Sequence, residues 1–392
     1  MSDRMIILEK PYVSAILAEM LERLQVPVLR NSMGEEVARN HDIRLMDEDS
    51  FVSLFRDSER PLLYSNSEDA IGWMEKKLGF SSLPGMIELC KDKVSYRKLL
   101  QDEYPDFFFT SIDYEALPGL DPSTLAKPFI IKPAVGFFSL GVYRVDSDTE
   151  WPDVLINIQR DVERVRGMYP REVLDTSRFI IEELINGDEY AVDLYYDAEG
   201  EPVILNILYH IFKSVADVSD RTYVTSQEVI ERCHGVFETS LRKFGKLAGL
   251  KNVPMHVEYR MENERLVPIE VNPMRFAAWC TTDIGYHAWG INTVEYFFEG
   301  KKPDWKEIFS TREGKVYPLN VAIVPEDIDI EDVKDIDYEG FASNYGNLLE
   351  MRKMDYRKYR VFAFTFSETD EKNRGEIDRM LRADLHPYII KK

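Results

Sequence analysis

The sequence predicts a fold that joins a parallel α/β layer at the N-terminus to α+β segments over the rest of the chain. Two observations carry this prediction. Short apolar runs alternate with helix-like stretches over roughly the first 85 residues, a pattern typical of a parallel sheet covered by helices. Later stretches place two alternating strands around a turn, which is typical of antiparallel hairpins. The chain has 392 residues, of which 44% are hydrophobic, so we expect several packed subdomains.

Charge and composition exclude several classes of function. The formal net charge is −21, from 49 basic and 70 acidic side chains, and such a surface repels nucleic acids and anionic membranes. We find neither an apolar run of about 18 residues nor a charged-then-apolar leader, so we expect no membrane span and no secretory signal. The three cysteines lack paired spacing, which argues against disulfides and zinc sites. We therefore expect a cytoplasmic protein that acts on small molecules.

The N-terminal layer is expected to lack a dinucleotide-binding turn. Such a turn needs the pattern GxGxxG after the first strand, but the first strand here runs into Leu8-Glu9-Lys10-Pro11. We therefore expect no NAD(P) or flavin site in this layer. An amphipathic helix is expected at 13–24, and strands are expected at 5–9, 27–31, 43–47 and 61–66.

The first stretch with a chemical signature is KPFIIKPAVGFFSLGVYRV at 127–145. It predicts two strands joined by a glycine-containing turn, with Lys132 on the first strand and Ser139 in the turn. Glycine lets the backbone approach a ligand closely, so the turn can wrap phosphate oxygens while Lys132 supplies a positive charge. An ordinary hairpin with a solvated lysine is the alternative interpretation, and this stretch alone does not decide between them.

The second stretch, RFIIEELINGDEYAVDLYYD at 178–197, predicts a buried strand, a short connector and a second strand. A connector between two subdomains is a suitable place for an adenine ring, which apolar side chains can sandwich while backbone groups read its edge. Glu189 follows the turn at Gly187 and could accept hydrogen bonds from ribose hydroxyls. The alternative is a solvated acidic turn, which we favour for Asp188. The connector consists of Glu182, Glu183, Leu184 and Ile185.

The third stretch, at 253–275, predicts a β-hairpin with one apolar and one polar face. A turn near residue 264 would set Glu258 opposite or diagonal to Glu270. Asn272 lies two residues beyond Glu270 and therefore points the same way. Two carboxylates and an amide oxygen on one face form a hard, all-oxygen site that suits Mg²⁺. A solvated polar face is the alternative, but facing like charges would then be destabilising.

Taken together, these stretches resemble the ATP-grasp superfamily, particularly its carbamoyl-phosphate synthase, biotin carboxylase and D-alanine–D-alanine ligase branches. The resemblance spans roughly residues 85–300. It depends on five segments in the expected order: DKVSYRKLL, FIIKPAVGFFSLGV, IIEELINGDEYAVD, HVEYR and IEVNPMR.

The resemblance implies ATP as cofactor, together with Mg²⁺ or Mn²⁺. It implies that Lys93 and Lys132 contact phosphates, with Ser139 in the lid, and that Arg275 lies near the transferred phosphoryl group. Two departures are visible: Phe137-Phe138 stand in the lid where small residues are common, and Arg275 follows Asn272 by three residues. By the same resemblance the adenine hinge is Glu182, Glu183, Leu184 and Ile185, the ribose acceptor is Glu189, and the metal ligands are Glu258, Glu270 and Asn272.

The resemblance also implies a domain division and a reaction. Residues 1–85 would form a pre-ATP-grasp α/β domain, 86–185 the small lid subdomain, 186–304 the large subdomain with the metal site, and 305–392 a C-terminal α+β cap. The expected reaction is ATP-dependent activation of a carboxylate as an acyl phosphate, followed by attack of an amine. Activation of bicarbonate or carbamate is one alternative, and a non-catalytic ATP-binding module is another.

The acceptor side of the predicted site is much less defined by the sequence. His287 could assist an incoming amine, although a lone histidine in an aromatic segment is more often structural. The identities of the carboxylate and the nucleophile stay open, and a homodimer is compatible with the sequence without being required by it. Further candidates for the acceptor side are His210, Lys213 and Arg221.

Overall fold

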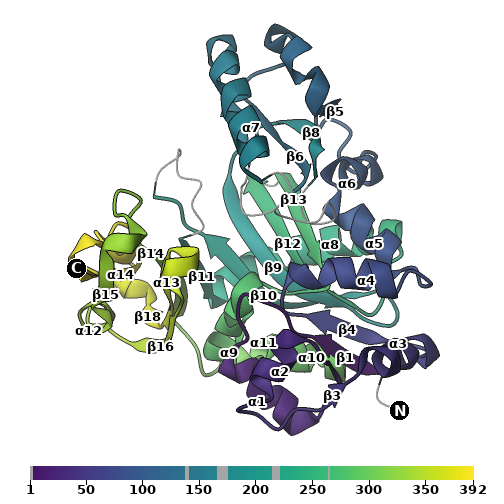
Figure 1. Ribbon diagram of the computed structural model, residues 1–392, viewed down its shortest axis with the longest axis vertical. Helices are drawn as coiled ribbons and strands as arrows, with labels where there is room; N and C mark the ends of the chain where they lie inside the picture. Colours follow the sequence, from purple (N-terminus) through teal and green to yellow (C-terminus); the bar gives the residue numbers. More distant parts are fainter. Residues whose placement is uncertain (1–2, 137–140, 166–174, 214–220, 264) are drawn as a thin grey trace.

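The computed structural model describes residues 3–136, 141–165, 175–213, 221–263 and 265–392. Three sheets lie one above another along the long axis (Figure 1). The N-terminal layer is at the bottom of the view, a small sheet is at the top, and a large central sheet lies between them, with the C-terminal segment to its left. In the described part of the chain, no helix combines the length and the apolar composition that a membrane crossing requires.

The N-terminal layer is a four-stranded sheet in the order β3-β2-β1-β4, and all its pairings are parallel. The predicted parallel layer is thus confirmed. Helix α1 begins at Ala15 because Ser14 caps it, accepting a hydrogen bond from the Leu17 amide at 3.1 Å. The elements are β1 Arg4–Ile7, α1 Ala15–Leu24, β2 Val28–Leu29, α2 Ser32–Val37, β3 Leu45–Met46, α3 Glu48–Asp57 and β4 Leu62–Ser65.

Three helices lead from this layer to the small sheet: α4 Ile71–Lys77, α5 Leu83–Lys91 and α6 Lys93–Leu99. The small sheet has the order β5-β8-β6-β7 and is antiparallel throughout. Helix α7 Trp151–Val165 packs on it through a cluster that includes Ile158, Phe129 and Phe179. The strands are β5 Phe109–Asp113, β6 Phe129–Val135, β7 Tyr143–Val145 and β8 Asp175–Glu183.

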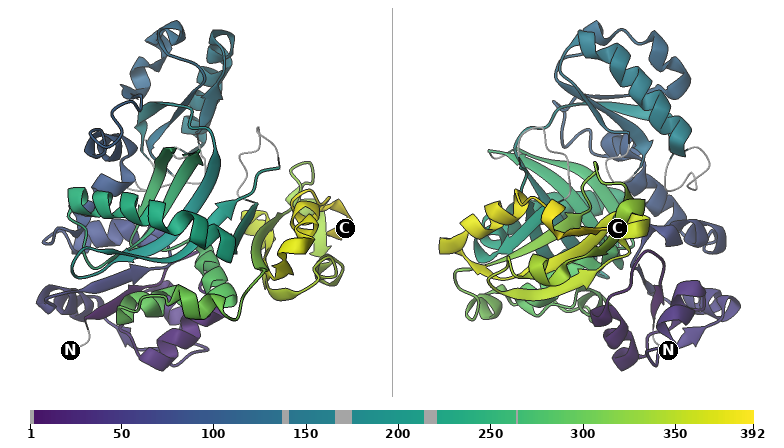
Figure 2. Two further views of the ribbon diagram at one scale, coloured as in Figure 1. Left: turned by 180° about the vertical axis from the view of Figure 1, so that it is seen from behind. Right: turned by 60° about the vertical axis from the view of Figure 1, so that its left-hand side comes forward.

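The central sheet has nine strands, eight of them in the order β13-β12-β9-β10-β11-β14-β17-β16, while β18 pairs with β14. Helix α8 Gln227–Ala248 lies across one face (Figure 2), where Phe237 stacks on Tyr259 with ring centroids 5.0 Å apart. The strands are β9 Asp188–Tyr196, β10 Pro202–His210, β11 Thr222–Ser226, β12 Val253–Glu262, β13 Arg265–Pro273, β14 Lys315–Ile323, β16 Leu348–Lys353, β17 Val361–Ser367 and β18 Thr369–Asp370.

The C-terminal segment shares the central sheet, because β14, β16 and β17 continue it beyond β11. A second, smaller hydrophobic cluster around Phe341 and Phe362 packs its outer elements. Those elements are β15 Val333–Ile336, α12 Tyr338–Ala342, α13 Tyr356–Tyr359, α14 Gly375–Leu381 and β19 Ile389–Lys391. Helices α9 Ile284–Trp289, α10 Thr293–Glu299 and α11 Trp305–Phe309 connect β13 to β14.

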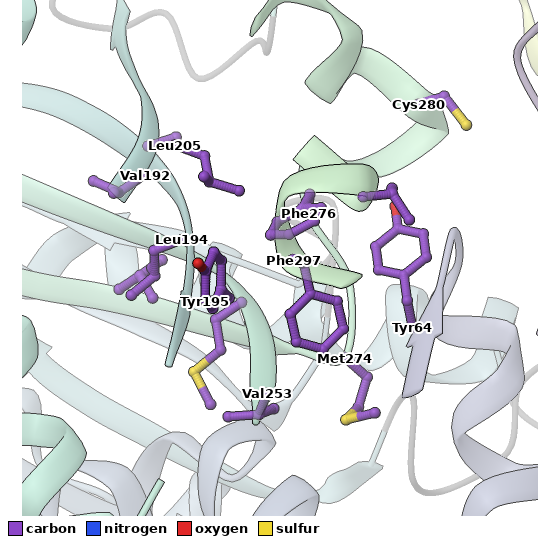
Figure 3. Close-up of a cluster of buried hydrophobic side chains, with 14 of the residues drawn as sticks. Tyr64, Val192, Leu194, Tyr195, Leu205, Val253, Met274, Phe276, Cys280 and Phe297 are labelled. Atoms are coloured by element: carbon purple, nitrogen blue, oxygen red, sulfur yellow. The ribbon is translucent and has the colours of Figure 1, made fainter. Parts of the chain in front are cut away.

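The N-terminal layer is joined to the central sheet at the loop that follows β13. The Ser65 amide at the end of β4 donates to the Met274 carbonyl at 2.9 Å. Next to this bond, the rings of Tyr64 and Phe276 lie 5.4 Å apart within a buried cluster (Figure 3). This junction brings the residues after β4 against the residues after Asn272.

Candidate active site

The β12–β13 hairpin presents two carboxylates and an amide on one face. In the observed register Glu258 pairs with Glu270 and His256 pairs with Asn272, so the predicted pairing of the two glutamates is confirmed. The next residue along β12, Tyr259, points to the other side of the sheet and packs on α8. The carboxylates therefore point away from α8, toward the opposite face of the sheet.

One detail of the predicted hairpin is wrong. Strict alternation along the strand places Ile269 on the apolar face with Val257 and Val271, but Ile269 is only half-buried, whereas Val257 and Val271 are buried. The register shifts between Glu258 and Tyr259, which leaves Ile269 as the extra residue of a β-bulge. A bulge breaks the strict alternation of faces, and this one lies directly beside Glu270.

Three cations from elsewhere in the chain surround the polar face. Lys93 Nζ donates to the Gly136 carbonyl at 3.1 Å and lies 3.5 Å from Glu270 Oε2, so it links the small sheet to the hairpin. Lys91 Nζ donates to Asn272 Oδ1 at 3.2 Å. The two lysines converge because α5 ends at Lys91 and α6 begins at Lys93, with Asp92 between them as N-cap.

The third cation, Arg275, is held by a carboxylate of the N-terminal layer. Its Nε donates to Glu68 Oε1 at 2.9 Å, and Lys91 donates to the other Glu68 oxygen at 2.6 Å. Burial raises the pKa of Glu68, but the charges of Lys91 and Arg275 outweigh it and keep the pKa well below its usual value. The loop around Arg275 includes non-glycine residues in the left-handed region, at Met274, Trp279 and Cys280.

Lys132 lies on β6 in a buried ionic cluster. Its Nζ is 2.9 Å from Glu182 Oε2, and Arg97 Nε donates to Glu182 Oε1 at 2.7 Å. Burial raises the pKa of Glu182, but Arg97 and Lys132 outweigh it and bring the pKa to about 2. Burial lowers the pKa of Lys132. The Glu182 side chain is thus occupied by two cations, and its backbone lies in the sheet between β5 and β6. An adenine contact by Glu182 stays a prediction.

The connector between β8 and β9 forms the predicted turn. Gly187 has φ +99°, and a Cβ at this position would lie 2.3 Å from the Met261 carbonyl oxygen, so only glycine fits. Glu189 accepts from Arg260 at 2.9 Å and lies 2.8 Å from His210 Nδ1. Burial raises the pKa of Glu189, but His210 and Arg260 outweigh it and lower it. A ribose contact by Glu189 stays a prediction.

Comparisons with known proteins identify a domain within the chain and solved structures with a similar fold. Residues 125–283 match the ATP-grasp domain family. The chain therefore contains an ATP-grasp domain. A comparison of the sequence with curated proteins gives no match.

Several solved structures are similar to almost the whole chain. L-amino acid ligase from Bacillus licheniformis superposes with a TM-score of 0.70 at 19% identity, over 99% of this chain and 98% of that one. Biotin carboxylase from Campylobacter jejuni gives 0.63 at 11% identity over 93% and 87%. N5-carboxyaminoimidazole ribonucleotide synthetase from Thermotoga maritima gives 0.63 at 13% identity over 97% of each chain. At such identities the likeness establishes the fold.

The donor set of the polar face suits Mg²⁺. Within the described ranges, no group of three or more His, Cys, Asp or Glu side chains is arranged to hold a metal by itself. Mg²⁺ is usually bound by one or two carboxylates together with phosphates and water. Glu258 and Glu270, directly opposite each other, with the Asn272 amide beside them, match that donor set.

The remaining candidates are dispersed. His287 Nε2 lies 2.7 Å from Glu350 on β16, so the structure places it in an ionic cluster with the C-terminal segment. Lys213 is exposed at the edge of a described range, and Arg221 lies just before β11, where its carbonyl accepts from Val321. Ser139 and Phe137-Phe138 lie outside the described residues.

Sequence reasoning missed four residues that pack around the polar face: Glu68, Lys91, Asp193 and His256. His256 Nδ1 lies 2.7 Å from Asp193 Oδ1 on the neighbouring strand β9. For His256 a signal was present, because it alternates with Glu258 on a strand whose polar face had been recognised. For Glu68 and Lys91 the sequence offers no comparable signal, because their partners lie far away along the chain.

Proposed function

We propose that the protein is an ATP-dependent carboxylate–amine ligase. ATP would lie between the small sheet and the central sheet, with its phosphates at the polar face of the β12–β13 hairpin. The in-register pair of Glu258 and Glu270 carries this proposal. Two carboxylates directly opposite each other repel, and a shared divalent cation would relieve that repulsion. Lys93 Nζ lies 3.5 Å from Glu270 Oε2, and the charges of both carboxylates act on Arg275.

We propose the following roles for the nucleotide contacts. Lys93 and Lys132 would contact the phosphates. Lys93 lies between the small sheet and the hairpin, and Lys132 shares Glu182 with Arg97, which donates to the Pro268 carbonyl of the hairpin. Lys132 is already paired with Glu182, so a bound phosphate would share the positive charge of Lys132 with that carboxylate. Backbone groups from Glu183 to Ile185 would read the adenine edge, and Glu189 would accept from the ribose. Ser139 would belong to the lid.

The chemistry follows from the charges at this face. A carboxylate is a poor electrophile, and transfer of the ATP γ-phosphoryl group turns it into an acyl phosphate with a good leaving group. Glu258, Glu270 and Asn272 would hold Mg²⁺, or Mn²⁺, which neutralises phosphate charge when bound. Arg275 and Lys91 would stabilise the phosphoryl group in transfer by electrostatic attraction. An amine would then attack the acyl carbon and release phosphate.

We also propose the domain division that the resemblance implies. Residues 1–85 would face the acceptor substrates, 86–185 would close over the nucleotide, and 186–304 would carry the metal ligands. The segment 305–392 would support the acceptor side through the cluster of Arg352 with Asp283, whose charged atoms lie 2.7 Å apart.

A screen for ADP release tests the proposed function. The protein is incubated with Mg·ATP and pairs of carboxylates and amines, including amino acids, and products are identified by mass spectrometry. We expect ADP and phosphate in equal amounts with an amide product. Incorporation of labelled bicarbonate would instead identify the carboxylase reaction. ATP binding without ADP release from any pair would identify a non-catalytic module.

A further inference from the structure

A histidine–aspartate pair lies at the end of the polar face that is farthest from the nucleotide hinge. His256 precedes Glu258 by two residues on β12, so both point to the same side of the sheet. On the same strand Arg260 donates to the Ile185 carbonyl of the hinge at 3.3 Å. Along β12, Arg260 therefore lies at the hinge, Glu258 comes next as a proposed metal ligand, and His256 lies beyond it.

The structure fixes the orientation of this imidazole. Asp193 is 1% exposed, and its Oδ1 accepts from the Ala277 amide at 2.8 Å while its Oδ2 accepts from the Thr282 hydroxyl at 2.7 Å. A carboxylate only accepts hydrogen bonds, so the 2.7 Å contact with His256 places the proton on Nδ1. The ring nitrogen that is left to meet a ligand is Nε2.

His256 Nε2 has no hydrogen bond to any other described residue. Glu258 Oε1 lies 3.8 Å away, which is too far for a hydrogen bond. Only 8% of the surface of His256 is exposed, so its imidazole is mostly enclosed on the polar face. The Arg275 loop begins beside it, since Ala277 and His256 share the same Asp193 oxygen.

We propose that His256 Nε2 accepts a hydrogen bond from the amine nucleophile and holds it against the activated carboxyl carbon. The inference rests on the proposed ligase function. In an extended ATP the γ-phosphate is the part farthest from adenine, so a group beyond the metal carboxylates meets the acceptor rather than the nucleotide. The ligand class is a primary or secondary amine, which has an N–H to donate. Asp193 acts as a positioning residue, because it orients the imidazole and the Arg275 loop together.

Two variants, His256→Asn and His256→Gln, separate the roles of the two ring nitrogens of His256. In His256→Asn the side-chain amide reaches the position of Nδ1 and can still donate to Asp193, but nothing replaces Nε2. In His256→Gln the longer amide reaches toward the position of Nε2 and offers an acceptor there. The matched control is His234→Asn, since His234 lies on α8, in a groove with Trp305 and Phe309, on the other face of the sheet.

The experiment measures two products of one activated intermediate. Hydroxylamine is a small nucleophile that captures an acyl phosphate as a hydroxamate, so hydroxamate reports activation while the amide reports transfer to the bound amine. We expect His256→Asn to lower amide formation by about 100-fold, as a misplaced nucleophile does, with hydroxamate formation little changed. His256→Gln should recover part of the amide, and His234→Asn should behave as the wild type.

Each outcome decides the proposal. Equal losses of amide and hydroxamate in His256→Asn would show that His256 serves activation or the fold, and would overturn it. Unchanged amide formation would overturn it as well. A thermal melt of each variant distinguishes a folding defect from a loss of function. Asp193→Asn provides a second test, because it should lower amide formation more than hydroxamate formation. A wild-type protein that forms neither product would refute the ligase function itself, which is a different result.

Discussion

Replacing Glu182 by Gln tests the buried ionic cluster beneath the proposed phosphate site. Glu182 is 2% exposed and accepts from both Arg97 and Lys132. Glutamine keeps the size of the side chain but removes its charge, so two buried cations lose the group that neutralises them. Leaving a buried charge without its partner is strongly destabilising.

The size of the effect follows from the pKa of Glu182. The pKa falls from 4.5 to about 2 in the folded protein, and at about 1.4 kcal/mol per pH unit this corresponds to roughly 3 kcal/mol. Because the folded pKa is the lower one, this stabilisation is present above about pH 4.5 and is lost as the pH falls toward 2. We therefore expect Glu182→Gln to lower the free energy of unfolding at pH 7 by roughly 3 kcal/mol.

Urea unfolding at pH 7 measures this change, and the neighbouring residue provides the control. Glu183 pairs with Arg265 at 2.6 Å, but the side chain of Arg265 is 50% exposed. Glu183→Gln should therefore cost at most about 1 kcal/mol. Equal effects of the two substitutions, or a loss below about 1 kcal/mol for Glu182→Gln, would show that the cluster does not stabilise the fold as argued.

Three further predictions concern binding, chemistry and the backbone. Millimolar Mg·ATP should raise the melting temperature by linkage, and Lys132→Ala should reduce that rise; no shift in the wild type would contradict the nucleotide assignment. Glu270→Gln should lower substrate-dependent ADP release by about 100-fold or more while nucleotide affinity falls less, and a folded variant with normal turnover would make this face a mere polar surface. Gly187→Ala should destabilise the protein by about 2 kcal/mol or more. Gly235→Ala should not, because a Cβ at that position meets nothing within 4 Å. Chemical denaturation measures both variants, and equal effects would refute the steric argument.

Local patterns were enough to predict several structural elements. The pairing of Glu258 with Glu270 was predictable because strand alternation and a turn near residue 264 fix which residues face each other. The parallel N-terminal layer was predictable for a similar reason, since alternating strands and helices leave few arrangements. The bulge at Ile269 was not predictable, because it depends on how two strands and the elements around them pack together.

The sequence by itself therefore determined the fold class, the strand that carries Glu270 and Asn272, and the turn at Gly187. Only the tertiary structure decided what surrounds them. Arg275 meets Glu68 across 207 positions of the chain, and Lys91 meets Asn272 across 181. Periodicity reports which face of an element a side chain occupies, but not which distant element will pack there. Contacts of this kind arise from the packing of whole layers against one another. Glu68 and Lys91, which carry no signal in the sequence, come to lie beside Arg275 and Asn272 for this reason.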